Sequence, residues 1–520
     1  MVKSVIIRRL SVIFVLTGFF GLLVCASPDG SIMTATAETL AQPLAEPLTL
    51  PAAANPGDST QASTSSQVYL PMTAANYPWR SPFGVESNED WFPETTIYQR
   101  GVDLGIQWTR MGTWRISWRT LQPNEGDPID WSKLVGFEKE LRGLKAKGIR
   151  PVVIVMDSPR WATINDVRND DQPTSCGPIR EDKFKAYAEF VRALVNRYKT
   201  DEFNLHNWEL GNEPDVDPDL VKLDSNYGCW GDIDNPLYGG EYYGEMLKVV
   251  TPAIKSADPS ARVWIGGLLL GEPNTTNRAL GKPELFLKGI LESGAAPYFD
   301  VVPYHNYVAY LNQTIDHDLK AGSWVQQGGG TLGKANYLRQ IMAEYGVVKE
   351  LYSNEASLMC PSTIGGHPAT YCTPPKSEFF HMQADHLVRT MVRALSGNIS
   401  GISWYTLNGP GWRYVGLLTR TADPNPAYTA YKFLVTQLTR ARYHGPINYG
   451  NGIEAHSFKR GNESVYIVWT IDAVPQIITI PNSKFIAAYT RKGEKITPDL
   501  VGNFYEFEIG FSPIYIIRKP

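Results

Sequence analysis

The sequence has little of what marks a nucleic-acid-binding or metal-binding protein. Its 49 Lys and Arg residues are outnumbered by 53 Asp and Glu residues, and no basic run follows the N-terminus. We therefore expect no nucleic-acid partner. The 8 His residues show no paired spacing at expected strand ends, and the 5 Cys residues include no CxxC pair. We therefore expect neither a metal nor a cofactor.

One apolar run, at residues 10–24, has the pattern of an export signal. It follows a positively charged N-terminus and leads to small residues suited to cleavage. The run is short for a membrane span. We expect residues 1–26 to direct secretion and to be removed, which leaves an extracellular protein without a membrane segment. The alternative is a lipid anchor at Cys25 that tethers the protein to the cell surface. Residues 27–66, rich in Ala, Thr, Ser and Pro, predict a flexible linker.

Export permits disulfide bonds, and four cysteines remain once Cys25 is set aside. Four cysteines allow three pairings. Cys360 and Cys372 lie close together in a stretch rich in Pro and Gly, which favours the pairs Cys360–Cys372 and Cys176–Cys229. Free or metal-binding thiols are the alternative, and they fit less well because no spacing typical of a metal site accompanies them.

Beyond residue 67, short apolar runs alternate with helical patterns. We expect strands at residues 82–85, 105–111, 151–156, 203–210, 263–268, 299–305, 350–354 and 399–405. Helical patterns, most with apolar residues three and four apart, follow at residues 95–104, 134–144, 184–198, 243–254, 284–291, 332–345, 380–395 and 427–439. Eight such units predict an α/β fold, a (β/α)8 TIM barrel over residues 67–442. A doubly wound open sheet is the alternative, but it calls for a glycine-rich phosphate turn after the first strand, and GVES at 84–87 is not one.

The last part of the chain, residues 443–520, has a different pattern. Short alternating runs, separated by turn residues, stand at residues 454–458, 464–470, 476–480, 485–489, 504–509 and 513–517. They predict a small antiparallel β-sandwich domain. This part carries no obvious reactive cluster, so we expect it to pack against the barrel.

Position along the barrel separates a catalytic carboxyl from a surface one. The pair Asn-Glu occurs at residues 88–89, 124–125, 212–213, 354–355 and 462–463. Catalytic groups of such barrels lie where strands end and loops begin, and Glu213 and Glu355 follow the fourth and seventh expected strands. Two carboxyls about 5–5.5 Å apart can cleave a glycosidic bond with retention of configuration. The alternative is that both are structural and pair with Arg side chains.

The segment WELGNEP at 208–214 closely matches the acid/base motif of clan A glycoside hydrolases. Within that clan the chain resembles family 39 most, with family 5 next. The segments SPRWA at 158–162 and DPSARV at 258–263 are similar to family 39. The resemblance implies a retaining hydrolase on a (β/α)8 barrel, with Glu213 as acid/base and Glu355 as nucleophile.

The resemblance covers residues 82–438, and the C-terminal domain is similar to the accessory sandwich seen in that family. The segment YSNEAS at 352–357 departs from the family pattern, which often has Thr or Ser before the nucleophile and Gly or Phe after it. Glu209 is in phase with Glu213 along its strand, so we expect it to point into the barrel as a buried polar residue.

Residues beside the two carboxyls can serve the same reaction. Asn212 can donate to the 2-hydroxyl of the sugar, a contact that strengthens in the transition state. Tyr307 can donate a hydrogen bond to Glu355, and Arg110 can pair with it, and both contacts favour the charged form that a nucleophile needs. His305 either binds sugar or holds the acid, and a purely structural His is the alternative.

Aromatic residues are the expected sugar contacts. Trp404 on the eighth strand could form the floor under the cleaved sugar, with a core-filling Trp as the alternative. Trp161 and Trp412, together with Trp114 and Trp230, stand in or near loops after strands. We expect two of these four to line sugar subsites.

The sequence therefore predicts a secreted retaining glycoside hydrolase that acts on a polysaccharide or oligosaccharide by double displacement. One alternative is a non-catalytic carbohydrate-binding protein on the same barrel, and the presence of both carboxyls argues against it. The other is a transglycosylase, which uses the same intermediate with a sugar as the acceptor.

Overall fold

A computed structural model describes residues 81–87, 93–112, 115–164, 177–221, 227–273, 277, 280–364, 367–450 and 452–520. The expected signal peptide and linker, Trp114 and Cys176 lie outside the described residues. Among the helices described, none is both long and apolar enough to cross a membrane.

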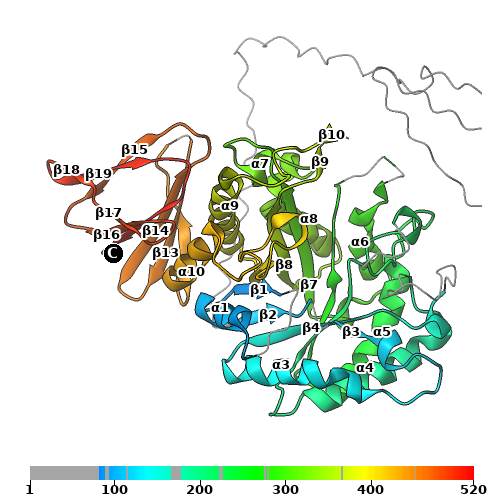
Figure 1. Cartoon of the computed structure of the whole chain (residues 1–520). Helices are drawn as coiled ribbons and strands as arrows, with labels where there is room; N and C mark the ends of the chain where they lie inside the picture. Colours follow the sequence, from blue (N-terminus) through cyan, green and yellow to red (C-terminus); the bar gives the residue numbers. More distant parts are fainter. Residues whose placement is uncertain are drawn as a thin grey trace, which may run out of the picture. The chain divides into compact units, whose positions relative to one another are not determined.

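Parallel strands form a closed barrel (Figure 1). They are β1 (Phe83–Glu86), β2 (Trp108–Arg110), β4 (Arg150–Met156), β5 (Asn207–Asn212), β6 (Arg262–Gly267), β7 (Val301–Ala309), β8 (Glu350–Met359) and β11 (Gly401–Tyr405). The order β2-β1-β11-β8-β7-β6-β5-β4 is closed by the pairing of β2 with β4, in which Thr109 faces Pro151. A short strand, β3 (Ile116–Ser117), pairs with β4. The predicted (β/α)8 TIM barrel is confirmed.

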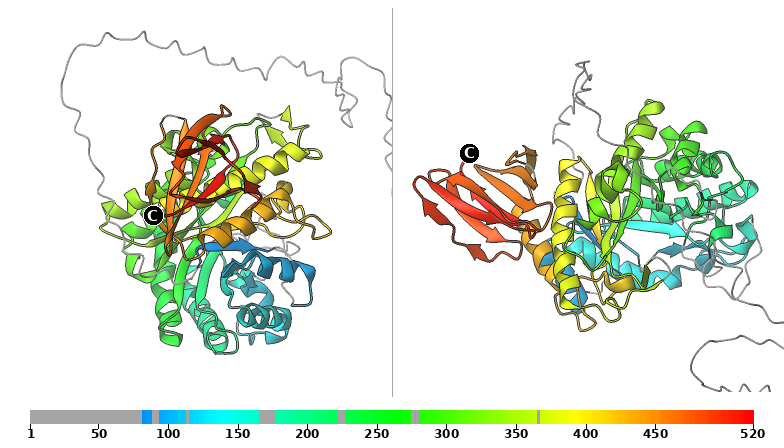
Figure 2. Two further views of the ribbon diagram at one scale, coloured as in Figure 1. Left: turned by 90° about the vertical axis from the view of Figure 1, so that its left-hand side faces the viewer. Right: turned by 90° about the horizontal axis from the view of Figure 1, so that it is seen from above.

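A helix follows each strand of the ring, and the helices surround the sheet (Figure 2). They are α1 (Thr96–Leu104), α3 (Val135–Ala146), α4 (Phe184–Tyr198), α5 (Gly240–Ala257), α6 (Phe286–Glu292), α8 (Gly329–Glu344), α9 (Ser377–Ser396) and α10 (Pro426–Leu438), with two short helices, α2 (Trp118–Leu121) and α7 (His317–Lys320), between them. Local capping sets their starts: the side chain of Thr95 accepts from the N–H of Tyr98 at 3.1 Å at the start of α1. Each helix buries its apolar stripe on the sheet, as the spacing predicts.

Bulky side chains fill the interior near the amino ends of the strands. Trp108, Trp264 and Tyr352 contact one another, with ring centroids 4.4 to 6.4 Å apart. Val152 and Val301 complete this buried layer. Because the layer closes the barrel from below, a site is left only at the carboxyl ends of the strands.

The C-terminal β domain contains two antiparallel sheets. One holds β12 (Arg442–Pro446), β13 (Ile453–Arg460), β14 (Glu463–Thr470), β20 (Ile514–Arg518), β16 (Phe485–Thr490) and β17 (Lys495–Ile496); the other holds β15 (Gln476–Pro481), β19 (Phe504–Ile509) and β18 (Asp499–Val501). The sequence prediction lacked β12, β17 and β18. The first contains Gly and Pro, and the other two are too short to show alternation.

The C-terminal domain contacts α9 through buried ionic groups. Arg393 donates to both carboxylate oxygens of Glu454 at 2.5 and 3.0 Å, and Arg389 donates to the carbonyl of Thr470 at 3.2 Å. Both arginines are almost fully buried. The expected packing of this domain against the barrel is therefore seen.

Candidate active site

A buried arginine lies at the centre of the barrel mouth. Arg110 ends β2 and is 1% exposed. Its Nε and Nη2 donate to the two carboxylate oxygens of Glu209 at 2.8 Å each. Its Nη1 donates to Glu86 at 2.8 Å and also to Glu355, and Nη2 donates to Oδ1 of Asn212 at 2.6 Å. The expected pair of Arg110 with Glu355 is present, and the same guanidinium serves two further carboxyls.

Glu355 lies on β8 and is held by two donors. The hydroxyl of Tyr307 donates to one of its oxygens and Nη1 of Arg110 donates to the other. Burial, followed by the charge of Glu355, raises the pKa of Tyr307 well above its usual value, so this hydroxyl keeps its proton. Glu355 is thus oriented as a hydrogen-bond acceptor at both oxygens, which is the state that a nucleophilic carboxylate requires.

Glu213 follows β5 in a strained backbone conformation. Its φ is +47°, which is costly for a residue other than glycine. The turn is held because the N–H of Glu213 donates to the carbonyl of Gly267 at 2.8 Å. Burial raises the pKa of Glu213 to about 7 from 4.5, although the positive charge of Arg110 acts in the opposite direction. A carboxyl with this pKa can both give and take a proton near neutral pH.

His305 on β7 contacts the Glu213 carboxyl. Its Nδ1 lies 2.8 Å from Oε1 of Glu213. Burial lowers the pKa of His305 to about 4, so the ring is neutral at neutral pH. A Cβ at Gly267 would meet Nε2 of His305 at 2.4 Å, which shows why glycine stands there. His305 was expected either to bind sugar or to hold the acid, and it is fully buried. For His305 the alternative of holding the acid fits the structure instead.

The carboxyls of Glu213 and Glu355 lie close together. One ligand atom from each of Glu213, His305 and Glu355 lies within 4.8 Å of the other two, whereas inverting enzymes space their carboxyls at about 6.5–9.5 Å. These three atoms could in principle bind a cation. The guanidinium of Arg110 already contacts Glu355, however, and its charge opposes a second cation there.

The expected sugar-binding tryptophans differ in exposure. Trp404 is fully buried, and its Nε1 donates to the carbonyl of Val415 at 2.9 Å. The prediction that Trp404 forms the floor of a sugar subsite is therefore wrong, because a ring with no exposed surface cannot stack on a ligand. The core-filling alternative holds. Trp412 is 47% exposed and packs edge-on against Tyr307 with ring centroids 5.6 Å apart, so it lies beside the residue that holds Glu355.

Trp161 and Trp230 are more enclosed than Trp412. Trp161 is partly buried, lies edge-on to Trp118 at 5.0 Å, and donates to the carbonyl of Gln122 at 3.3 Å. Trp230 is 8% exposed. Among the tryptophans that the structure describes, Trp412 is thus the one best placed to meet a sugar ring.

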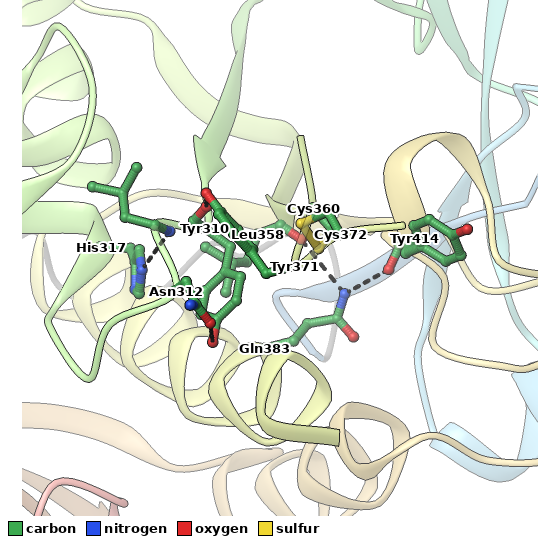
Figure 3. The surroundings of a disulfide bond; sticks show 10 residues. Tyr310, Asn312, His317, Leu358, Cys360, Tyr371, Cys372, Gln383 and Tyr414 are labelled. Carbon is green, nitrogen blue, oxygen red and sulfur yellow. Dashed lines mark hydrogen bonds between the residues drawn. A yellow bond between two sulfur atoms is a disulfide. The ribbon is translucent and has the colours of Figure 1, made fainter. Parts of the chain in front are cut away.

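The predicted disulfide Cys360–Cys372 is present and lies near Tyr414 (Figure 3), which belongs to the same short 3-10 helix as Trp412. The N–H of Cys360 donates to the carbonyl of Arg413 at 2.9 Å. On the other side, Nε2 of Gln383 donates to the carbonyl of Tyr414 at 3.0 Å. This short helix is therefore tied by its backbone to both β8 and α9. Cys229 is disulfide-bonded, while its expected partner Cys176 is outside the described part of the chain.

Three ionisable residues at or beside the site were not predicted. Glu86 ends β1, and burial raises its pKa to about 8; the same strand-end rule that selected Glu213 would have found it. Asp215 accepts from the N–H groups of two residues after β6, and burial raises its pKa to about 7. Lys334 comes from α8, and no rule about strand ends could have found it.

The fold is that of glycoside hydrolases of families 39 and 30. Matching structures include a family 39 glycoside hydrolase from the gut symbiont Bacteroides cellulosilyticus WH2, which is 18% identical over 85% of this chain and 81% of that one, with a TM-score of 0.60. A family 39 β-xylosidase from Caulobacter crescentus is 15% identical, covering 85% of this chain and 96% of that one, with a TM-score of 0.53. A family 30 endoxylanase from Clostridium papyrosolvens C71 is 15% identical with the same coverage and a TM-score of 0.50. No protein-family model and no curated protein matches the sequence.

Proposed function

We propose that this protein is a retaining glycoside hydrolase that uses Glu213 as acid/base and Glu355 as nucleophile. The observation that carries the proposal is the pair of close carboxyls in contrasting surroundings. Glu355 accepts from Arg110 and Tyr307, while no arginine in the described part of the chain donates to Glu213, whose pKa burial raises to about 7. One group is thus prepared to attack as an anion and the other to deliver a proton.

In the first step, a sugar lies across the mouth with its anomeric carbon next to Glu355. The carboxylate of Glu355 forms a bond to that carbon while the bond to the glycosidic oxygen breaks. The electron pair of the broken bond goes to the oxygen, which takes the proton of Glu213. Arg110 and Tyr307 keep the attacking carboxylate in place. The products are a leaving sugar and a glycosyl ester on Glu355.

In the second step, Glu213 has lost its proton and acts as a base. A water molecule gives it a proton and attacks the anomeric carbon, and the ester bond to Glu355 breaks with its electrons returning to the carboxylate. Two displacements at one carbon restore the original configuration. Asn212, whose Oδ1 is held by Arg110, is positioned to donate through Nδ2 to the 2-hydroxyl of the sugar.

The substrate that we propose is a polysaccharide or oligosaccharide outside the cell. The disulfide Cys360–Cys372 supports an oxidising compartment, and so does the export signal expected at residues 1–26. The similar structures are named as a β-xylosidase and an endoxylanase, so xylose-containing substrates belong among the first to be tried.

The experiment is reducing-sugar release from a broad polysaccharide panel by the wild type and by Glu355→Gln. Glu463→Gln is a matched control, because Glu463 belongs to another Asn-Glu pair and contacts Arg460 in the β domain. Release by the wild type and the control, but not by Glu355→Gln, supports the proposal. Equal release by all three removes Glu355 from the mechanism. Binding of a polysaccharide without any release would favour the non-catalytic alternative, and longer oligosaccharide products would indicate transglycosylation.

A stereochemical test checks the roles of the two carboxyls. With an activated aryl glycoside and azide as nucleophile, Glu355→Ala should form the glycosyl azide of inverted configuration in one displacement. Glu213→Ala should form the azide of retained configuration, because its nucleophile is intact. The opposite assignment of products would exchange the two roles.

A further inference from the structure

Within the described residues, a buried lysine behind the site has backbone carbonyls as its hydrogen-bond partners. Lys334 lies on α8 and is 6% exposed. Its Nζ donates to the carbonyl of His305 at 2.8 Å and to that of Leu269 at 2.9 Å. Within the described chain no carboxylate forms an ion pair with it. An ammonium group buried without a direct counter-ion is costly, so its place needs an explanation.

The sequence before Lys334 lets α8 approach the barrel closely. A Cβ at Gly330 would meet Oδ1 of Asn306 on β7 at 2.0 Å, and a Cβ at Gly329 would meet the carbonyl of Asp318 at 2.6 Å. A larger residue at Gly330 would push the start of α8 away from β7, and one at Gly329 would push it away from α7. Glycine weakens a helix, and here it allows the helix to come near enough for Lys334 to reach the strand end.

The lysine and Asp215 hold the same peptide from opposite sides. The carbonyl of Leu269 accepts from Lys334, and the N–H groups of Leu269 and Leu270 donate to Asp215 at 2.9 Å each. Asp215 stands two residues after Glu213. Lys334 therefore donates to the backbone of His305, whose ring contacts Glu213. Through Leu269 it also stabilises the loop after β6, which binds Asp215.

We propose that Lys334 is a positioning residue for the acid/base, which fixes the backbone of His305 and places a buried positive charge behind Glu213. The inference rests on the proposed function of Glu213. A nearby cation favours the carboxylate form, and so it offsets part of the effect of burial on the pKa of Glu213. Burial lowers the pKa of Lys334 to about 8, so most of the lysine is charged at the midpoint of the Glu213 titration, near pH 7.

Other charged and titratable groups act on the same two residues. Those that face Glu213 or Lys334 are Arg110 on β2, Glu209 on β5, Asp215 after β5, His305 on β7, Glu355 on β8, Tyr227 in the loop after β5, Glu272 after β6 and Asp318 on α7. None of them is changed by replacing Lys334, so the effect of its charge can be measured against a constant background.

The first test is the pH dependence of hydrolysis in Lys334→Met. The acid form of Glu213 is needed for bond cleavage, so activity falls as pH rises through its pKa. Loss of the positive charge raises that pKa, and we expect the basic limb of kcat/KM to move to higher pH by roughly one unit. We expect kcat to fall about ten-fold and KM to change less than two-fold, because His305 and Glu213 are displaced while the sugar contacts remain. A basic limb that stays in place would overturn the proposal.

Lys349→Met is the matched control. Lys349 also donates to a backbone carbonyl, that of Phe299 at 2.6 Å, but it precedes β8 and so lies at the opposite end of the barrel. Its replacement should leave the basic limb unchanged. A shift equal to that of Lys334→Met would show that the effect comes from net charge or stability, and it would refute the proposed role of Lys334.

Asp215→Asn provides a second variant of nearly unchanged shape. The charge of Glu213 raises the pKa of Asp215, and this repulsion acts equally on Glu213. Removing the Asp215 charge should therefore move the basic limb to lower pH, opposite to Lys334→Met. Carbon-13 NMR of the Glu carboxyls, with the Glu213 signal identified by its loss in Glu213→Gln, follows the same titration without a substrate. A Glu213 titration that moves in these directions supports the proposal even if no sugar is hydrolysed, in which case only the proposed function fails. A titration that coincides in wild type and both variants overturns the proposal.

Discussion

Replacing Arg110 with Met should make the stability of the protein strongly dependent on pH. Arg110 is the cation that directly contacts three buried carboxyls, those of Glu86, Glu209 and Glu355. Without it, each carboxyl must either remain charged in a buried site or bind a proton. Burial already raises the pKa of Glu86 to about 8 with Arg110 present, which indicates how little water reaches these groups.

The expected size follows from the cost of breaking a buried ion pair, about 3–5 kcal/mol. Loss of the guanidinium charge should favour the protonated form of these buried carboxyls, and the folded-state pKa of Glu86 already lies above its unfolded value of 4.5. Their folded form is therefore favoured at low pH, and that stability is lost as pH rises through the folded pKa. We expect Arg110→Met to be destabilised by about 3–5 kcal/mol at pH 8 and by clearly less at pH 5.

Thermal unfolding of the wild type and the variant at pH 5 and pH 8 measures this difference. Arg142→Met is the control, because Arg142 is a half-exposed arginine that pairs with Glu138 and Glu202. Its loss should cost under about 1 kcal/mol at both pH values. If Arg110→Met loses the same stability at pH 5 and pH 8, packing rather than charge accounts for its role, and the reasoning is refuted.

Three further variants test neighbouring contacts. Tyr307→Phe should lower kcat by about 10- to 100-fold with little change in KM, since a hydrogen bond to a charged group contributes about 1.5–3 kcal/mol; an unchanged kcat would exclude the contact with Glu355 from catalysis. Trp412→Ala should raise KM about five-fold, as loss of about 1 kcal/mol of stacking predicts, and a lower kcat at constant KM would contradict a binding role. Glu86→Gln should be more stable than the wild type at pH 9 but not at pH 4, because the pKa of Glu86 is about 8 in the folded protein and 4.5 in the unfolded one. Thermal unfolding at both pH values decides it, and equal stability at pH 9 would show that Glu86 is not desolvated.

The sequence was sufficient for the barrel and for the two carboxyls because both depend on regular features. Alternating strands and helices define the fold, and the fold brings strand ends together. Arg110 ends β2 and Glu213 directly follows β5, so their meeting could be predicted from topology. Glu355 was expected after a strand at residues 350–354, but β8 continues to Met359 and Glu355 lies within it. The same rule about strand ends would also have selected Glu86. It was missed because it ends a short strand and no known motif surrounds it.

The rest of the site depends on contacts that no local pattern reports. Trp404 stands at a strand end like the residues that were predicted correctly, but the chain around Val415 covers it. Lys334 reaches the site because Gly330 allows α8 to approach Asn306 closely. Loops and helices distant in sequence decide whether a side chain such as Trp404 is covered and whether one such as Lys334 reaches the site. The spacing of apolar residues along the chain carries no information about these contacts.

Four buried carboxyls surround the site, and one cation, Arg110, contacts three of them. Arg110 binds Glu209 through two nitrogens, contacts Glu86 and Glu355 through the third, and makes no hydrogen bond to Glu213 that the structure records. A hydrogen bond from the guanidinium favours the charged form of a carboxyl, and burial opposes it: burial raises the pKa of Glu86 to about 8 despite its contact with Arg110, and that of Glu213 to about 7. The proposed roles therefore rest on two separate features: Arg110 and Tyr307 orient Glu355 as a hydrogen-bond acceptor for attack, and burial gives Glu213 a pKa near neutral pH, which suits a proton donor.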